Sequence, residues 1–189
     1  MRATGRFATV ACLLAFLLTV LCPAVIAQNS VTLFSSTATP VVVNFNAGAP
    51  LELGMNFTAD VNGYISGVRF YKGAMNLGVH VGSLWTSTGQ LLAQATFANE
   101  TASGWQQVAF STPVAIAADT VYVVSYHSSG YYSYDPGYFN SPVDNPPLYA
   151  VSGANGNGVY SYGPSSVFPV TAAAGANFWV DVVFSTTPP

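Results

Sequence analysis

Two acidic side chains, Glu52 and Asp181, fall inside apolar segments whose alternation is typical of β-strands. Two carboxyl groups that face each other across a cleft can hydrolyse a glycosidic bond. A buried carboxylate also needs a counter-charge, and Arg69 is the only arginine after the first 27 residues. The residue types therefore favour a structural polar cluster of Arg69 with Glu52 or Asp181 over catalysis.

Few residues could hold a metal ion or act as a nucleophile. The two histidines, His80 and His127, each end a predicted strand, and with a carboxylate they could bind zinc. Neither an HxH nor an HExxH pattern occurs, so we expect each histidine to form hydrogen bonds at a sheet end. Calcium stays open as a ligand of carbonyls and turn carboxylates, without an Asp-rich loop to indicate it. We predict no cofactor, and the GxSxG pattern of serine hydrolases is absent.

Tyrosine and proline are concentrated between residues 128 and 147, in the segment SSGYYSYDPGYFNSPVDNPP. Because prolines restrict the conformations of a chain, we predict an ordered loop that projects from one end or edge of a rigid scaffold. Tyrosine rings offer flat apolar faces and a polar tip, which suit stacking on a sugar. The predicted ligand-binding residues are Tyr131, Tyr132, Tyr134 and Tyr138, with His127 and Asp135 supplying hydrogen bonds beside them.

A second interpretation of this segment is equally compatible with its composition. The rings could fold down as a lid over a sheet edge, where they would stabilise the fold instead of a ligand complex. The acceptor pattern for N-linked glycans also occurs, at Asn56 and Asn99, and it matters only in a eukaryotic host.

Short runs with a period of two, separated by Gly, Asn, Pro and Ser, make up most of the remaining chain. Ten such runs predict an all-β fold, an antiparallel two-sheet β-sandwich that is jelly-roll-like or immunoglobulin-like. The predicted strands are Val41–Asn46, Leu51–Thr58, Gly63–Tyr71, Val79–Thr86, Leu91–Thr96, Trp105–Ala109, Val114–Ile116, Val121–His127, Gly158–Tyr160 and Phe178–Phe184. The predicted core includes Leu53, Phe57, Val68, Phe70, Leu84, Val123, Val182 and Phe184.

Residues 1–27 have the pattern of a removable signal peptide, with Arg2 and Arg6 ahead of an apolar run and a small-residue site before Gln28. An uncleaved membrane anchor is the alternative. Both cysteines fall within this segment, so residues 28–189 form a single predicted domain without disulfides. We therefore expect a secreted or cell-surface protein that does not insert into a membrane after cleavage.

Charged residues make up 6% of the sequence, which limits the partners that the protein can bind. After the signal peptide, Arg69 and Lys72 are the only basic side chains, against seven acidic ones. A polyanion is bound through clustered Lys and Arg, so this composition excludes nucleic acid as a partner. A basic helix on a membrane surface is excluded for the same reason.

Several long strings, in this order along the chain, resemble the family of the domain of unknown function numbered 4082. They include GVRFYKGAMNLGVHVGSLWTSTGQLLAQATFANETASGWQQVAFSTPVAI, TVYVVSYHSSGYY, NGVYSYG and FWVDVVF. The resemblance covers Val31 to Phe184. It implies a secreted or surface β-sandwich module, of a kind often found beside immunoglobulin-like, cadherin-like or carbohydrate-active domains. It supplies no activity and no catalytic residue.

Together these patterns predict a secreted, non-catalytic module that binds carbohydrate or another cell-surface ligand. A structural or adhesive spacer without a small-molecule site is the main alternative. A secreted hydrolase comes third, because the residue types that catalysis needs are scarce.

Overall fold

The regular secondary structure of the described residues is almost entirely β-strand. The computed structural model describes residues 30–151 and 157–189, together with Met1, so that the predicted signal peptide, residues 1–27, lies outside the described residues apart from Met1. The helical structure in the described residues is one 3-10 turn, η1 (Tyr138–Asn140). No helix in the described ranges is long and apolar enough to cross a membrane. The predicted all-β class is confirmed.

The larger sheet has the strand order β12-β11-β2-β7-β4-β5, and its neighbouring strands run antiparallel. β10 extends the sheet along β2 beyond the end of β11 and pairs with β9 on its other side. The strands are β2 (Leu51–Ala59), β4 (Val81–Thr86), β5 (Leu91–Thr96), β7 (Tyr122–Ser128), β9 (Asp144–Asn145), β10 (Leu148–Ala150), β11 (Gly158–Tyr162) and β12 (Thr171–Ala172).

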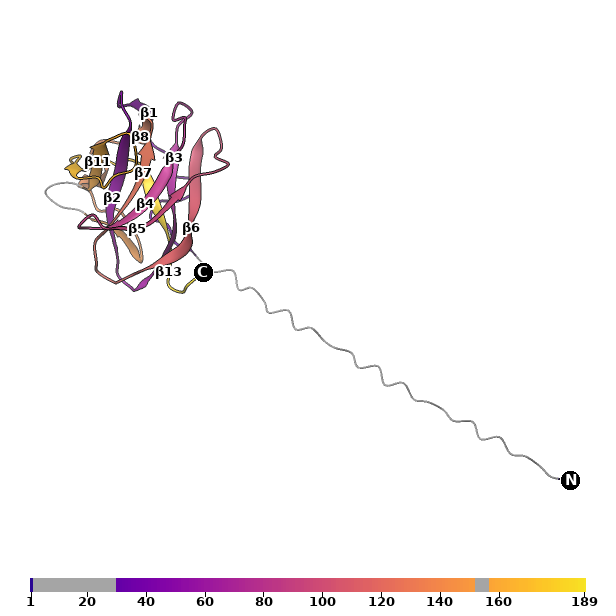
Figure 1. The fold of residues 1–189 in the computed structure, drawn as a ribbon. Helices are drawn as coiled ribbons and strands as arrows, with labels where there is room; N and C mark the ends of the chain where they lie inside the picture. Colours follow the sequence, from indigo (N-terminus) through magenta and orange to yellow (C-terminus); the bar gives the residue numbers. More distant parts are fainter. Residues whose placement is uncertain (2–29, 152–156) are drawn as a thin grey trace.

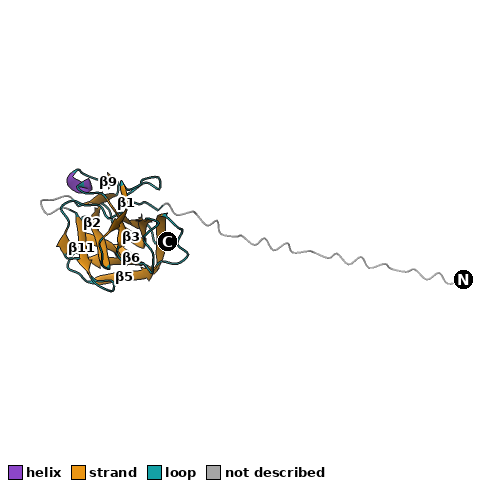
Figure 2. Cartoon of the chain, turned by 90° about the horizontal axis from the view of Figure 1, so that it is seen from above, coloured by secondary structure: helices purple, strands orange, loops and turns teal. Residues whose placement is uncertain are grey.

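The smaller sheet has the order β13-β3-β6 and packs on the larger one, with β13 near β7 and β3 near β4. A separate antiparallel pair, β1 and β8, lies at one end of the sandwich (Figure 1). Seen from above, η1 and β9 lie next to each other on the side of β1 (Figure 2). The strands are β1 (Val42–Asn46), β3 (Gly63–Lys72), β6 (Gly104–Ile116), β8 (Tyr131–Tyr134) and β13 (Val180–Ser185).

All eight predicted core residues are buried, with exposed fractions of at most 2%. Between the sheets the ring of Phe70 stacks on Tyr126 at a centroid distance of 4.4 Å and meets Phe97 edge-on at 4.8 Å. Val123 is the exception in position: it lies opposite Trp85 on the outer face of the larger sheet. Both faces of the central strands are therefore covered, whereas the alternation of apolar and polar residues alone predicts that only one face is buried.

The strands predicted as Trp105–Ala109 and Val114–Ile116 form one continuous strand, β6. Pro113 lies within this strand and has no backbone N–H to give to a ladder. β6 is an edge strand of the smaller sheet, however, and only its β3 side takes part in the ladder. A proline can occupy such an edge without the loss of a backbone hydrogen bond, and the register shifts opposite this region, between Ile65 and Gly67.

Residues 128–147 are more regular than the loop that their composition predicts. Tyr131–Tyr134 form strand β8, which pairs with β1 in the registers Phe45↔Tyr132 and Asn46↔Tyr131. The aromatic pair across the two strands stabilises this pairing. The prolines come after β8, from Pro136 onward, and leave its backbone donors intact. The prediction of a loop over this whole segment was wrong.

Arg69 and Asp181 form the predicted ion pair on adjacent strands of the smaller sheet. They lie directly opposite each other in β3 and β13, and Arg69 Nε donates to Asp181 Oδ2 at 3.1 Å. The carboxylate also accepts the backbone amides of Leu33, Phe34 and Val182 at 2.7–2.9 Å. Burial raises the pKa of Asp181, and Arg69 and these amides oppose the rise. The four donors around the carboxyl group favour its charged form and so limit this rise.

Glu52, the alternative partner for Arg69, does not belong to this cluster. It lies on β2 in the larger sheet, and its carboxyl group accepts a hydrogen bond from the Ser125 hydroxyl. The predicted three-residue polar cluster is therefore an Arg69–Asp181 pair, with Glu52 buried separately. The scarcity of basic residues suggested that Glu52 and Asp181 would share Arg69. The two carboxyl groups instead lie in different sheets, and only Asp181 reaches Arg69.

We expect Arg69→Ala to lower the free energy of unfolding by about 3–5 kcal/mol, because it leaves the buried Asp181 carboxylate without its cation. Arg69→Lys is the matched control, since it keeps the charge and loses the guanidinium contacts with Phe34 O and the Trp105 ring. Urea denaturation followed by circular dichroism should rank the parent first, Arg69→Lys second and Arg69→Ala last. Equal midpoints for all three proteins would show that the pair contributes nothing to stability.

Candidate functional site

An aromatic cleft lies between the β1–β8 pair and the edge of the larger sheet. Tyr132 and Tyr134 are two positions apart on β8, so their rings project to the same face. The ring of Phe45, on β1, lies 5.2 Å from that of Tyr132 and 5.3 Å from that of Tyr134 between centroids. These three rings form the first wall of the cleft.

The second wall comes from β11 and the residues after β12. Tyr160 and Tyr162 lie side by side on β11, with ring centroids 5.9 Å apart, and Ala172–Ala174 continue the wall. Phe178 contacts both walls, at 5.6 Å from the Tyr132 ring and 6.4 Å from the Tyr160 ring. The cleft has a volume of about 380 Å³, which is within the range of small-molecule sites.

The hydroxyl groups of Tyr132, Tyr134, Tyr160 and Tyr162 have no hydrogen-bond partner among the described residues. They also lie close to one another. The pKa of Tyr132 is raised above its ordinary value, first by burial and then by the charges that Tyr162, Tyr134 and Tyr160 would carry if ionised. The cleft therefore presents phenolic hydroxyls, each able to donate one hydrogen bond and to accept others.

The cleft is uncharged, and its rings are graded from an accessible rim to a buried floor. No acidic or basic side chain lines it. Tyr162 and Phe45 are 58% and 41% exposed, whereas Tyr132 and Phe178 are 7% and 3% exposed. Such a site can stack on a flat apolar surface and hydrogen-bond to neutral polar groups, but its lining residues offer no group for proton transfer at neutral pH.

Two of the four predicted ligand-binding tyrosines lie outside this cleft. Tyr131 projects to the other face of β8, and its hydroxyl is 3.3 Å from Asn46 Nδ2. Tyr138, on η1, packs on Trp179 at 5.7 Å and on Phe34 at 6.0 Å between ring centroids. The four rings therefore do not share one surface: Tyr132 and Tyr134 face the cleft, and Tyr138 covers a separate aromatic cluster.

Asp135 and His127 also lie outside the lining of the cleft. Asp135 is buried, its Oδ1 accepts the Val41 amide at 2.7 Å, and its backbone exchanges two hydrogen bonds with Asn177. His127 Nε2 donates to the carbonyl of Gly163 at 3.0 Å. Both side chains are occupied in holding neighbouring segments of the fold together.

His80 takes part in a charged cluster at the start of β4. Its Nδ1 lies 2.8 Å from Glu100 Oε1, its Nε2 lies 2.9 Å from Asn76 Oδ1, and Lys72 Nζ donates to Glu100 Oε2 at 2.7 Å. Burial lowers the pKa of His80, and the nearby Glu100 opposes this. As expected, each histidine forms hydrogen bonds near a strand end. In residues 30–151 and 157–189 no three His, Cys, Asp or Glu side chains group as metal ligands would.

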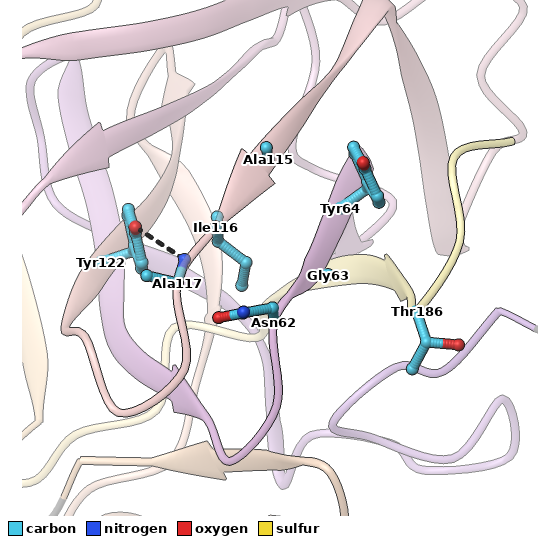
Figure 3. A pocket seen from close by; sticks show the side chains of 8 residues that line it. All are labelled: Asn62, Gly63, Tyr64, Ala115, Ile116, Ala117, Tyr122 and Thr186. Carbon is cyan, nitrogen blue, oxygen red and sulfur yellow. Dashed lines mark hydrogen bonds between the residues drawn. The ribbon is translucent and has the colours of Figure 1, made fainter.

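A second hollow, of about 550 Å³, lies where the turn before β3 meets the turn after β6 (Figure 3). The Tyr122 hydroxyl accepts a hydrogen bond from the Ala117 amide at 3.2 Å, which is the dashed line in Figure 3. Asn62 Oδ1 accepts the amide of Ala118 at 2.8 Å. Because two of its polar side chains already hold these turns, this hollow offers fewer free groups to a ligand than the aromatic cleft does.

The sequence matches a family model described as "Domain of unknown function (DUF4082)" over residues 37–180. The chain belongs to this family. All the rings of the aromatic cleft, from Phe45 to Phe178, lie within the matched residues. No curated protein matches the sequence.

Half of the cleft of this DUF4082 domain is not among the predicted site residues. Tyr160 was predicted to end a strand, and Tyr162 and Phe45 had no predicted role. A signal for them exists, because the tripeptide YSY occurs twice, at residues 132–134 and 160–162. In each copy the period of two turns both tyrosines to one face, and the fold sets the two copies on facing walls of the cleft.

Glu52 lies on the opposite face of β2 from the cleft of the DUF4082 domain. The Ser125 hydroxyl donates to its Oε1 at 2.5 Å, and Trp85 Nε1 donates in turn to Ser125 Oγ at 2.8 Å. Oε2 is buried without a hydrogen-bond partner. Burial raises the pKa of Glu52 from 4.5 to about 7, although Ser125, Ser166 and the Val167 amide lie close enough to oppose the rise. Glu52 is therefore largely protonated in the folded protein below neutral pH.

This pKa predicts a stability that falls as the pH rises from about 4.5 to about 7, because over this range the unfolded chain releases a proton that folded Glu52 retains. The total loss is about 3 kcal/mol. Glu52→Gln should match the parent near the lower pH and exceed it by that amount above neutrality, as measured by urea denaturation across pH.

The difference in the free energy of unfolding between the parent and Glu52→Gln separates the effect of Glu52 from that of His80. The lowered pKa of His80 acts in the opposite direction, because protonation of the buried ring costs stability as the pH falls. A parent-minus-variant difference that does not vary with pH would mean that Glu52 has an ordinary pKa in the folded protein.

Proposed function

We propose that this DUF4082 domain is an extracellular, non-catalytic module that binds neutral carbohydrate in the aromatic cleft. One observation carries the proposal: two YSY segments face each other across an uncharged cleft, and their four tyrosine hydroxyls have no partner among the described residues. A sugar ring has an apolar C–H face and a rim of hydroxyls, which match a tyrosine face and its polar tip. The proposed extracellular location rests on the predicted signal peptide, residues 1–27.

The arrangement of the rings supports binding with little reorganisation. Tyr132 and Tyr134 are fixed by contacts with Phe45 and Phe178, so the first wall loses little freedom when a ligand arrives. Tyr162 at the rim is 58% exposed, so its ring is accessible to a ligand. A jelly-roll-like or immunoglobulin-like sandwich, the finer fold that we propose, provides the rigid support for such a site.

The positions of the carboxyl groups favour binding over hydrolysis. Hydrolysis of a glycosidic bond needs two carboxyl groups on either side of the substrate. Glu52 and Asp181 lie in different sheets, each is enclosed by its own partners, and neither lines the cleft. The cleft itself contains only phenols, apolar rings and small apolar side chains.

The test is retention of residues 28–189 on a panel of immobilised neutral polysaccharides, followed by titration calorimetry with a soluble oligosaccharide of the retained type. We expect Tyr162→Ala to weaken binding by about tenfold or more, because it removes a stacking face. Tyr162 is 58% exposed, so the free energy of unfolding should change by no more than about 0.5 kcal/mol.

Tyr64→Ala is the matched control, because Tyr64 is a half-buried tyrosine that lines the second hollow instead of the cleft. It should leave binding unchanged. A loss of retention in Tyr64→Ala but not in Tyr162→Ala would move the ligand to the second hollow, and a failure of the parent on every polysaccharide would refute the proposal.

A structural or adhesive role is the second candidate, and one observation favours it. The segment between β3 and β4 exposes three apolar side chains in five residues: Met75, Leu77 and Val79 are 52%, 64% and 69% exposed. Clustered exposed apolar residues are typical of protein contact surfaces. Concentration-dependent self-association in sedimentation experiments, lost on replacement of Leu77 by Ser, would support this role.

A further inference from the structure

Residues 163–170, between β11 and β12, cross the outer face of the larger sheet as a strap. Gly54 of β2 shows how closely they approach: a Cβ atom there would lie 3.0 Å from Pro169 Cγ. Phe168 packs against Trp85 of β4 with ring centroids 5.8 Å apart. The strap therefore reaches across the sheet from β11 to β4 and covers the polar residues beneath it.

Polar contacts hold the strap on the sheet from its beginning to its middle. His127 Nε2 donates to the carbonyl of Gly163 at 3.0 Å. Further along, the hydroxyl of Ser166 lies 3.1 Å from that of Ser83 on β4. Side-chain contacts of this kind are individually weak, so a moderate free-energy change beneath the strap is enough to release it.

Glu52 is the acidic group that the strap encloses, and its side chain has no exposed surface. His127 on β7 and Ser161 on β11 lie directly opposite it in the register. Tyr126, next to His127, is the other titratable group near it, and the strap and the facing part of β4 present only serines and apolar side chains. No Lys or Arg in the described ranges forms an ion pair with Glu52.

The strap and the second wall of the cleft are one continuous structure. Tyr160 and Tyr162 project from β11 into the cleft, whereas Ser161 between them projects to the strap side. Ser161 Oγ accepts the amide of Val170, at the end of the strap, at 3.0 Å. The chain then enters β12 and Ala172–Ala174, which complete the same wall. A movement of the strap therefore moves both components of that wall.

We infer that the strap is a latch that holds the second wall of the cleft in place, and that a proton on Glu52 keeps the latch closed. Loss of the proton creates a carboxylate with no cation beside it, and such a group must draw in water. Water reaches Glu52 when the strap lifts. The consequence for ligand binding rests on the proposed function: the domain would hold neutral carbohydrate more tightly in mildly acidic surroundings than in alkaline ones.

The burial of Glu52 sets the pH range of the latch. With a pKa of about 7 under the strap and 4.5 in water, the population of the open form rises by roughly 30-fold between pH 5.5 and pH 8.5. This change in the open population occurs around neutral pH, so modest pH differences between extracellular environments would alter the cleft.

Hydrogen–deuterium exchange of residues 163–174 without any ligand tests the latch directly, because local opening exposes the amides. After correction for the intrinsic effect of pH on exchange, the parent should exchange about 30-fold more readily at pH 8.5 than at pH 5.5. Glu52→Gln should stay protected at both values. An unchanged parent, or a variant that still switches, would overturn the inference.

Two further variants keep the test decisive. His127→Gln removes the neighbouring titratable group and can still donate to Gly163, so its exchange should change with pH as that of the parent does. If His127→Gln abolishes this pH dependence, His127 carries the proton and the inference is wrong.

Ser166→Ala removes a contact between the strap and β4, so it should raise exchange even at pH 5.5. No change in exchange would show that the strap is held by other means. Ser166→Ala also provides a test if Glu52→Gln does not fold.

Polysaccharide retention at the two pH values separates this inference from the proposed function. Retention that is equal at both values, with exchange unchanged, refutes the latch and leaves carbohydrate binding in place. A clear exchange switch with no retention at either value refutes carbohydrate binding and leaves the latch in place. Retention that is stronger at pH 5.5 in the parent, and equal at both values in Glu52→Gln, supports both.

Discussion

The alternation of side chains along two adjacent strands, β2 and β11, is the constraint on which the arrangement of this domain depends. On one face these strands supply Leu51, Tyr160 and Tyr162 to the aromatic cleft, and on the other face they supply Glu52 and Ser161 to the underside of the strap. A pleated strand cannot move one set without the other. The aromatic cleft and the buried acid are thus joined by the backbone that carries both.

The domain has few charges and gives each buried carboxyl group a different environment. Asp181 is surrounded by four donors, and it ties the segment at Leu33 and Phe34 to the last strand. Glu100 lies between Lys72 and His80. Glu52 has one hydroxyl donor and no cation, so burial dominates its titration. Donor number and counter-charge, more than burial alone, decide which acid is structural and which can respond to pH.

Aromatic side chains perform two separate tasks at the same end of the sandwich. Trp105, Trp179 and Tyr138 pack around Phe34 and close the outer face of the smaller sheet. The tyrosine hydroxyls of the YSY segments instead have no hydrogen-bond partner among the described residues, and the ring of Tyr162 is 58% exposed. Within the tyrosine-rich segment, Tyr138 therefore belongs to the packed cluster, whereas Tyr132 and Tyr134 line the cleft.

By itself the sequence determined the all-β class, the buried positions and the need of Arg69 for a carboxylate partner, because period-two alternation and scarcity of charge are local and compositional properties. Only the tertiary structure decided which tyrosines meet. Tyr132 and Tyr160 are far apart in the chain, and the pairing of β8 with β1 and of β11 with β2 brings them to one cleft. The tertiary structure also decided that Glu52 lies under the strap and not beside Arg69. The alternation of side chains shows that the two faces of a strand differ, but it does not show which segment of the chain covers each face.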